Sequence, residues 1–107
     1  MNAVMDKLPA LVTEEKAAAN QVHGPFASLH EGYAVLLEEV TETVEALGHV
    51  QYHTEKLWEA IRGDADHLAG MAAARIEGWA VSVAAEALQV AAMAQKLQDM
   101  GRSDRNE

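Results

Sequence analysis

The sequence predicts an all-α protein in which a short N-terminal helix precedes a long antiparallel helical hairpin. Half of the residues are hydrophobic, many of them alanine, and there are only two prolines. This composition favours helices that pack closely through small side chains. Apolar residues recur every three or four positions through two long stretches, as on one face of a helix. The length of 107 residues fits a single domain.

The first helix is predicted over residues 10–22. Pro9 suits the first turn of a helix, and the residues after it are mostly strong helix formers. Gly24 can end this helix, and Pro25 cannot continue it. Residues 1–8 and 101–107 are expected to be mobile ends of the domain.

The clearest start signal is that of the second helix. Residues 28–31 (SLHE) have the spacing of a capping box, with Ser28 as the N-cap and Glu31 reaching back. An apolar stripe follows, made of Leu29, Tyr33, Leu36, Val40, Val44 and Leu47 and continued by Thr54, Trp58 and Ile61. Gly48 is its weak point, so the helix either runs on to Ile61 or breaks near Gly48. We favour one long helix.

The third helix begins after a tight turn. Gly63 suits the C-cap of the second helix and Asp64 the N-cap of the third. The apolar stripe then restarts at Leu68, and Gly101 is expected to end the helix. Such a turn makes the two long helices an antiparallel hairpin, in which residues whose numbers sum to about 128 lie opposite one another.

Charge and composition exclude several classes of protein. The formal net charge is −9, which argues against nucleic acid and against an anionic membrane surface as partners. It fits a protein that binds cations, or simply an acidic one. The absence of cysteine excludes disulfides, thiolate zinc sites and a cysteine nucleophile. With neither a signal-peptide pattern nor an apolar run of membrane-spanning length, we expect a cytoplasmic protein.

Three glutamates within residues 38–42 (EEVTE) are the main candidate for a site. They lie close together on one helix, where like charges repel. Alone, this string favours a solvated acidic face over a metal site. The hairpin register, however, sets Glu86 opposite Glu42 and Gln89 opposite Glu39. Four glutamates in one groove could not all stay ionised without a cation, and their oxygens suit Mg²⁺.

These two blocks resemble the MazG-like, all-α nucleoside triphosphate pyrophosphohydrolases, in particular a phage and prophage branch. The family signature is EExxE on one helix and ExxD on a later antiparallel helix. Here it reads Glu38-Glu39-Val40-Thr41-Glu42 and Glu86-Ala87-Leu88-Gln89. The resemblance covers most of residues 24–100. It implies a homo-oligomer that hydrolyses an NTP or dNTP to the monophosphate and pyrophosphate with Mg²⁺, or alternatively Mn²⁺.

The resemblance also implies roles for individual residues. The metal ligands would be Glu38, Glu39, Glu42 and Glu86, with Gln89 at the position of the family aspartate; Glu38 and Glu39 would be catalytic. Two departures stand out: Gln89 supplies no charge, and the gap between the motifs is longer than the family usually has. The alternative is therefore a catalytically weak or inactive MazG-like module that binds nucleotides or proteins.

Five further residues are candidates for substrate binding, and four of them have a plainer alternative. They are Lys16, His30, Tyr33, Arg75 and Trp79. A solvated lysine, a first-turn histidine, a salt bridge for Arg75 and core packing for Trp79 are the plainer readings. The register places Trp79 opposite His49 and Arg75 opposite His53. His49 and His53 could hold a transition metal, although polar surface is favoured.

The apolar residues of the third helix predict an oligomer. Apolar residues such as Val81, Val83 and Val90 surround it, and a chain of three helices leaves one face of the hairpin uncovered. We expect a homodimer, or a homotetramer, that completes a four-helix bundle.

Overall fold

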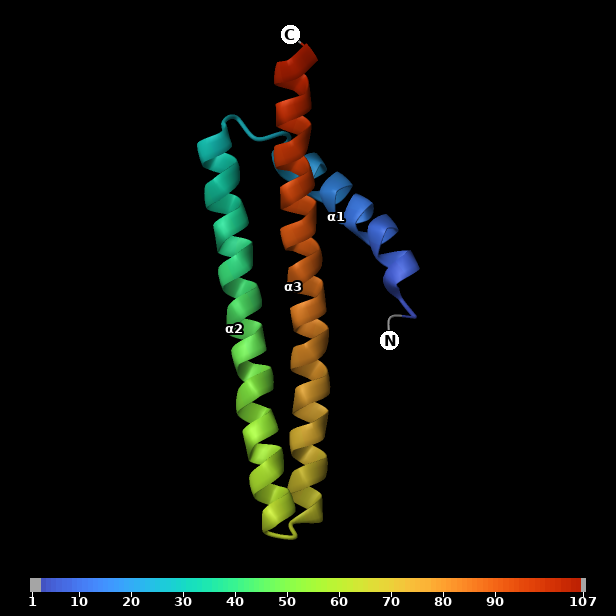
Figure 1. Ribbon diagram of the computed structural model, residues 1–107, viewed down its shortest axis with the longest axis vertical. Coiled ribbons are helices and arrows are strands. Elements are labelled where there is room, and N and C mark those ends of the chain that lie inside the picture. Colours follow the sequence, from blue (N-terminus) through green and yellow to red (C-terminus); the bar gives the residue numbers. More distant parts are fainter. Residues whose placement is uncertain (1–2, 107) are drawn as a thin grey trace. The chain divides into compact units, whose positions relative to one another are not determined.

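The computed structural model describes residues 3–106, with side chains described as far as Gly101. A 3₁₀ turn, η1 (Met5–Lys7), leads into α1 (Leu8–His23), α2 (Leu29–Arg62) and α3 (Asp66–Asn106) (Figure 1). No strand occurs in this range, so the all-α prediction is confirmed. Residues 1, 2 and 107, which belong to the ends expected to be mobile, lie outside the described residues.

The end of α1 follows the predicted signal. Gly24 has a φ of 69° and donates its N–H to the carbonyl of Asn20 at 2.9 Å. Glycine has no Cβ and adopts this left-handed conformation without strain, which is why it commonly ends helices.

The start of α2 is a capping box with one shifted bond. Ser28 Oγ accepts the N–H of Glu31 at 3.1 Å, as predicted. The Glu31 carboxylate reaches back to the N–H of Ala27, at 3.3 Å, rather than to that of Ser28. Beyond this cap, α2 continues without a break through Gly48, which confirms the single long helix.

The turn between α2 and α3 is a Schellman motif with an unexpected residue in the left-handed position. Asp64 has a φ of 53°. Its N–H bonds the carbonyl of Ile61 at 3.1 Å, and the N–H of Ala65 bonds that of Ala60 at 2.9 Å, which is the motif's bond pair. The expectation that Asp64 caps α3 is therefore wrong, because its backbone completes the end of α2.

Replacing Asp64 by glycine is expected to stabilise the protein. A non-glycine residue in the left-handed region carries a steric cost that glycine avoids. We expect the free energy of unfolding to rise by about 0.5–1 kcal/mol, measured by urea denaturation. The matched control is Gly63→Ala, whose added methyl would lie 3.4 Å from the carbonyl oxygen of Glu59, an ordinary contact. A loss of stability in Asp64→Gly would contradict this account of the turn.

The third helix is longer than expected. It runs through Gly101 to Asn106, so the expectation that Gly101 ends the helix is wrong. A glycine within a helix costs only about 1 kcal/mol relative to alanine, and one glycine therefore does not terminate a helix by itself.

The chain forms two compact units. Unit 1 comprises Met1–Val40 and Glu86–Glu107, and unit 2 comprises Thr41–Ala85. In unit 1, α1 crosses the C-terminal part of α3 (Figure 1). The core of this unit consists of Val12, Phe26, Ala92 and Met93, with Leu36, Leu88 and Leu97 packed against it.

Unit 2 is the hairpin formed by the adjoining parts of α2 and α3. The rings of His49 and Trp79 stack with centroids 3.8 Å apart and an interplanar angle of 10°. This pairing confirms the predicted register within unit 2. Buried alanines, namely Ala46, Ala60 and Ala72, let the two helices lie close together.

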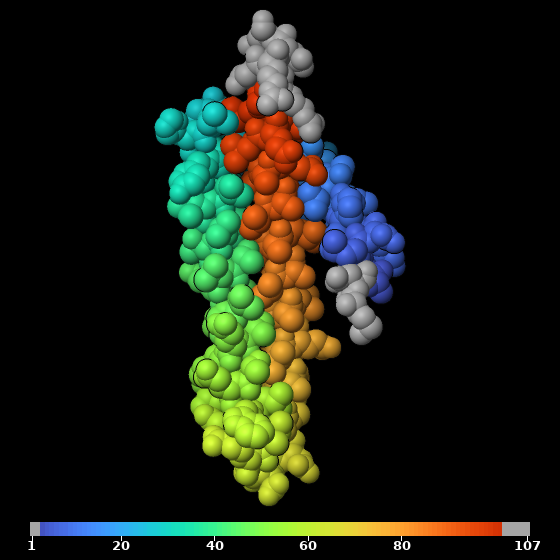
Figure 2. Space-filling view, viewed as in Figure 1, coloured from blue at the N-terminus to red at the C-terminus, as the bar shows by residue number. Residues whose placement is uncertain are grey.

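The inward face of α2 differs from its most apolar face. Its buried residues are small or polar, namely Gly32, Ala46, His53 and Ala60. Large apolar side chains on other faces of the helix are exposed, namely Tyr33, Val44, Leu47, Trp58 and Ile61. In the space-filling view, the green to yellow-green atoms of α2 form part of the visible face (Figure 2). Within the described residues, no helix is both long and apolar enough to span a membrane.

Candidate metal centre

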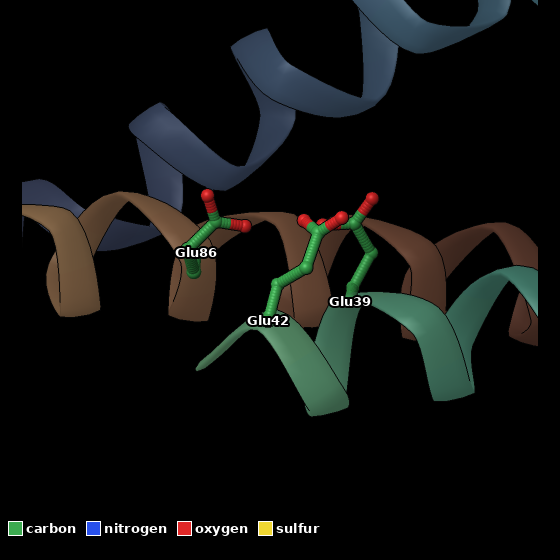
Figure 3. Close-up of side chains that lie close together, drawn as sticks. All are labelled: Glu39, Glu42 and Glu86. Carbon is green, nitrogen blue, oxygen red and sulfur yellow. The ribbon is translucent and has the colours of Figure 1, made fainter. Parts of the chain in front are cut away.

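Two carboxylates from different helices meet in unit 1. Glu39 projects from α2 and Glu86 from α3, both half-buried. A carboxylate oxygen of one lies within 4.8 Å of a carboxylate oxygen of the other (Figure 3). The hairpin therefore brings together two acidic residues that are 47 positions apart in the sequence.

Glu42 adds a third carboxylate at the next turn of α2. It follows Glu39 by three residues on an uninterrupted helix, so the two side chains project from neighbouring turns. Their carboxylate oxygens also lie within 4.8 Å of each other (Figure 3). Among the described residues, Glu39, Glu42 and Glu86 are the one group of three acidic, histidine or cysteine side chains gathered this closely.

The chemistry of these donors fits a hard cation. Carboxylates this close repel one another, and a positive partner relieves the repulsion. Mg²⁺ prefers oxygen ligands and is usually bound by a few carboxylates while keeping several waters. Glu39, Glu42 and Glu86 therefore suit Mg²⁺ or Mn²⁺ better than zinc, which is most often held by nitrogen and sulfur.

A groove of about 660 Å³ in unit 1 adjoins this cluster. Glu39 belongs to both, and Glu38 lines the groove beside it. Apolar side chains from all three helices form much of its wall, among them Ala19, Val35 and Met93. The volume is in the range of small-molecule sites, so the groove can accept part of a nucleotide.

Gln89, predicted as a ligand, is held by a residue of α1. Its Nε2 donates a hydrogen bond to the carboxylate of Glu15, and both side chains line the groove. This bond brings the negative charge of a residue of α1 beside Gln89. No local pattern in the sequence indicates Glu15, because its role depends on how α1 packs in unit 1.

Lys96 is a second residue that the sequence analysis missed. Its side chain is only 5% exposed. The ammonium group donates to the carbonyl oxygen of Gly24 at 3.0 Å and lies 4.2 Å from the centroid of the Phe26 ring. Lys96 thus ties the connector after α1 to α3. The feature of the sequence that could have indicated Lys96 is its position as a lone lysine within an apolar helical stretch.

The five candidate substrate-binding residues do not gather at the groove. Lys16 forms a salt bridge with Asp99 at 3.1 Å. His30 and Tyr33 are exposed on the first turns of α2 and are not among the groove residues. Arg75 and Trp79 belong to unit 2 and line other hollows there.

The two histidines proposed as an alternative metal pair are engaged separately. His49 stacks on Trp79, whereas His53 is buried beside the edge of the Tyr52 ring, at 5.1 Å between centroids. Within the part of the chain that the structure describes, neither joins a group of three ligands.

No model of a known protein family, no curated protein and no solved structure matches this chain. The case for a function therefore rests on the chemistry of its own side chains.

Proposed function

We propose that this protein is a Mg²⁺-dependent nucleoside triphosphate pyrophosphohydrolase that converts an NTP or dNTP to the monophosphate and pyrophosphate. The observation that carries the proposal is the approach of Glu39 and Glu86 within 4.8 Å, with Glu42 one turn from Glu39. The MazG-like signature resembles these residues in type and spacing. The adjoining groove offers room for part of a nucleotide.

In this proposal Glu39, Glu42 and Glu86 hold the cation. A bound divalent cation supplies neutralisation of phosphate charge and activation of water. Glu38 is exposed and lines the same groove as Glu39. In this proposal it accepts the proton of the attacking water. The apolar wall near Val35 and Met93 would exclude water from one side of the substrate.

Release of pyrophosphate tests the proposed activity. The purified protein is incubated with a panel of NTPs and dNTPs, with Mg²⁺ and with EDTA, and the products are separated. We expect a monophosphate and pyrophosphate in equal amounts, only with Mg²⁺. If no nucleotide yields pyrophosphate, and Mg²⁺ does not raise the melting temperature, the alternative of an inactive helical binding module is favoured.

The Glu15–Gln89 pair is proposed to replace the charge of the family aspartate. Groups that support metal ligands typically change affinity or activity 10- to 100-fold. Glu15→Gln is therefore expected to lower activity about tenfold. The double variant Glu15→Gln with Gln89→Asp moves the carboxylate from α1 to α3 and should recover most of that loss, as measured in a double-mutant cycle. If the loss in the double variant equals the sum of the losses in the two single variants, this exchange is contradicted.

A homodimer or homotetramer is proposed on a separate observation. Large apolar side chains along α2 are exposed, with Val44 63% and Trp58 58% accessible. Contiguous exposed apolar surface is typical of interfaces. Light scattering at micromolar concentration should show a dimer or tetramer, and Val44→Glu with Trp58→Glu should shift it to a monomer. A monomeric wild-type protein would contradict this proposal.

A further inference from the structure

Unit 2 contains a groove of about 440 Å³ that is separate from the residues of the candidate metal centre. One wall comes from α2 and includes Tyr52, His53 and Lys56. The other comes from α3, where Leu68, Met71 and Arg75 are spaced as on one helix face. The groove therefore combines exposed apolar side chains, such as Leu68 and Met71, with basic side chains.

The charge of this groove is opposite to that of the chain. The whole protein carries a formal net charge of −9. Residues 41–85 contain seven carboxylates and three Lys or Arg residues, two of which, Lys56 and Arg75, line this groove. Glu59 is the one carboxylate among the groove residues. The basic side chains are thus concentrated where the apolar surface is hollowed.

On the α2 side of the groove, the basic residue Lys56 contacts two neighbouring side chains. Lys56 Nζ lies 3.3 Å from Glu59 Oε2 and 5.5 Å from the centroid of the Tyr52 ring. The hydrogen bond to Glu59, together with its negative charge, raises the pKa of Lys56, so this side chain stays cationic at neutral pH. Tyr52 in turn meets the His53 ring edge to face.

Arg75 is the second basic residue of the groove, and it takes no part in the Lys56–Glu59 pair. Among the side chains that the structure describes, none forms an ion pair with its guanidinium. Arginine presents a planar set of donors that suits a carboxylate or phosphate, and binding is strongest beside an apolar surface that excludes water. An anionic group on a ligand would complete this arrangement.

We infer that the groove of unit 2 binds a small amphipathic anion, whose acidic head pairs with Arg75 and whose apolar body lies on Leu68 and Met71. The volume is within the range of small-molecule sites. The lining favours both parts of the ligand, because the apolar side chains favour a hydrocarbon body and the basic side chains favour an anion.

The test uses 2-naphthoate as the probe, with 2-naphthylmethanol as its neutral counterpart. Binding to the full-length protein is followed by NMR of the Met71 methyl group. We expect saturable 1:1 binding of 2-naphthoate, with the alcohol about tenfold weaker, because a hydrogen bond to a charged group contributes at least that factor. Arg75→Leu should weaken 2-naphthoate about tenfold and leave the alcohol unchanged.

Arg62→Leu is the matched control. Arg62 lies on α2 in the same unit and is not among the groove residues. The substitution Arg62→Leu therefore removes the same charge outside the groove. Its affinity for 2-naphthoate should stay within about twofold of the wild type, because exposed charges at a distance are screened. The inference is overturned if the Met71 signal does not shift with millimolar 2-naphthoate, if the alcohol binds as tightly as the acid, or if both arginine variants weaken binding equally.

Discussion

Glu39→Gln is expected to lower Mg²⁺-dependent pyrophosphate release by about a hundredfold or more. Glu39 is the residue that belongs both to the carboxylate cluster and to the adjoining groove. The substitution keeps the shape of the side chain but removes the charge that a divalent cation requires. The measurement is the initial rate of pyrophosphate release over a range of Mg²⁺ concentrations. We also expect the concentration of Mg²⁺ giving half the maximal rate to rise.

The matched control for this prediction is Glu45→Gln. Glu45 lies on the same helix one turn beyond Glu42, is exposed, and is not a member of the cluster. It should retain the wild-type rate. The melting temperature of each metal-free variant is measured beside its activity, which separates the loss of a cation site from unfolding. Equal losses in both variants would contradict a specific role for Glu39.

Gly32→Leu is expected to destabilise the protein by about 3 kcal/mol. Gly32 is buried in α2, where even a methyl group would overlap the side chain of Leu97 and lie 2.9 Å from Phe26 Cδ2. A larger side chain must displace both neighbours from the core of unit 1, since protein interiors have little free volume. This cost is a large fraction of the 5–15 kcal/mol that stabilises a typical domain. Urea denaturation measures it directly.

Gly48→Leu separates packing from helix propensity. Gly48 lies on the same helix, and a Cβ there would meet no atom within 4 Å. Leucine is the better helix former, so this variant should gain about 0.8 kcal/mol. If Gly32→Leu were also neutral or stabilising, the close approach of α2 to Leu97 and Phe26 would be wrong.

Much of the fold could be predicted from local signals. The helix boundaries at Gly24 and Ser28 follow from caps and turn residues, whose chemistry acts over a few positions. The register that pairs His49 with Trp79 followed from the position of the turn and the rise of a helix. Expectations that a glycine ends a helix were less reliable. Helix α3 continues through Gly101, and in the turn before α3 the left-handed residue is Asp64 rather than a glycine.

The remainder depends on contacts between elements that the sequence does not pair. Apolar periodicity located a stripe on α2, but the helix turns a neighbouring face inward, where Gly32 and Ala60 permit close packing. The hairpin register set Glu86 opposite Glu42, and it therefore led us to expect Glu86 near the glutamates of α2. The bond from Gln89 to Glu15 could not be expected, since it requires the position of α1.

Mn²⁺ titration followed by NMR tests most directly whether the carboxylate cluster binds a divalent cation. Mn²⁺ takes the same oxygen ligands as Mg²⁺ and broadens the signals of nearby nuclei. We predict that substoichiometric Mn²⁺ first broadens the amide signals around Glu39, Glu42 and Glu86, and that excess Mg²⁺ restores them. The Glu39→Gln variant should need much more Mn²⁺ for the same effect. Uniform broadening over all the acidic surface, or none at these three residues, would contradict a metal centre at this position.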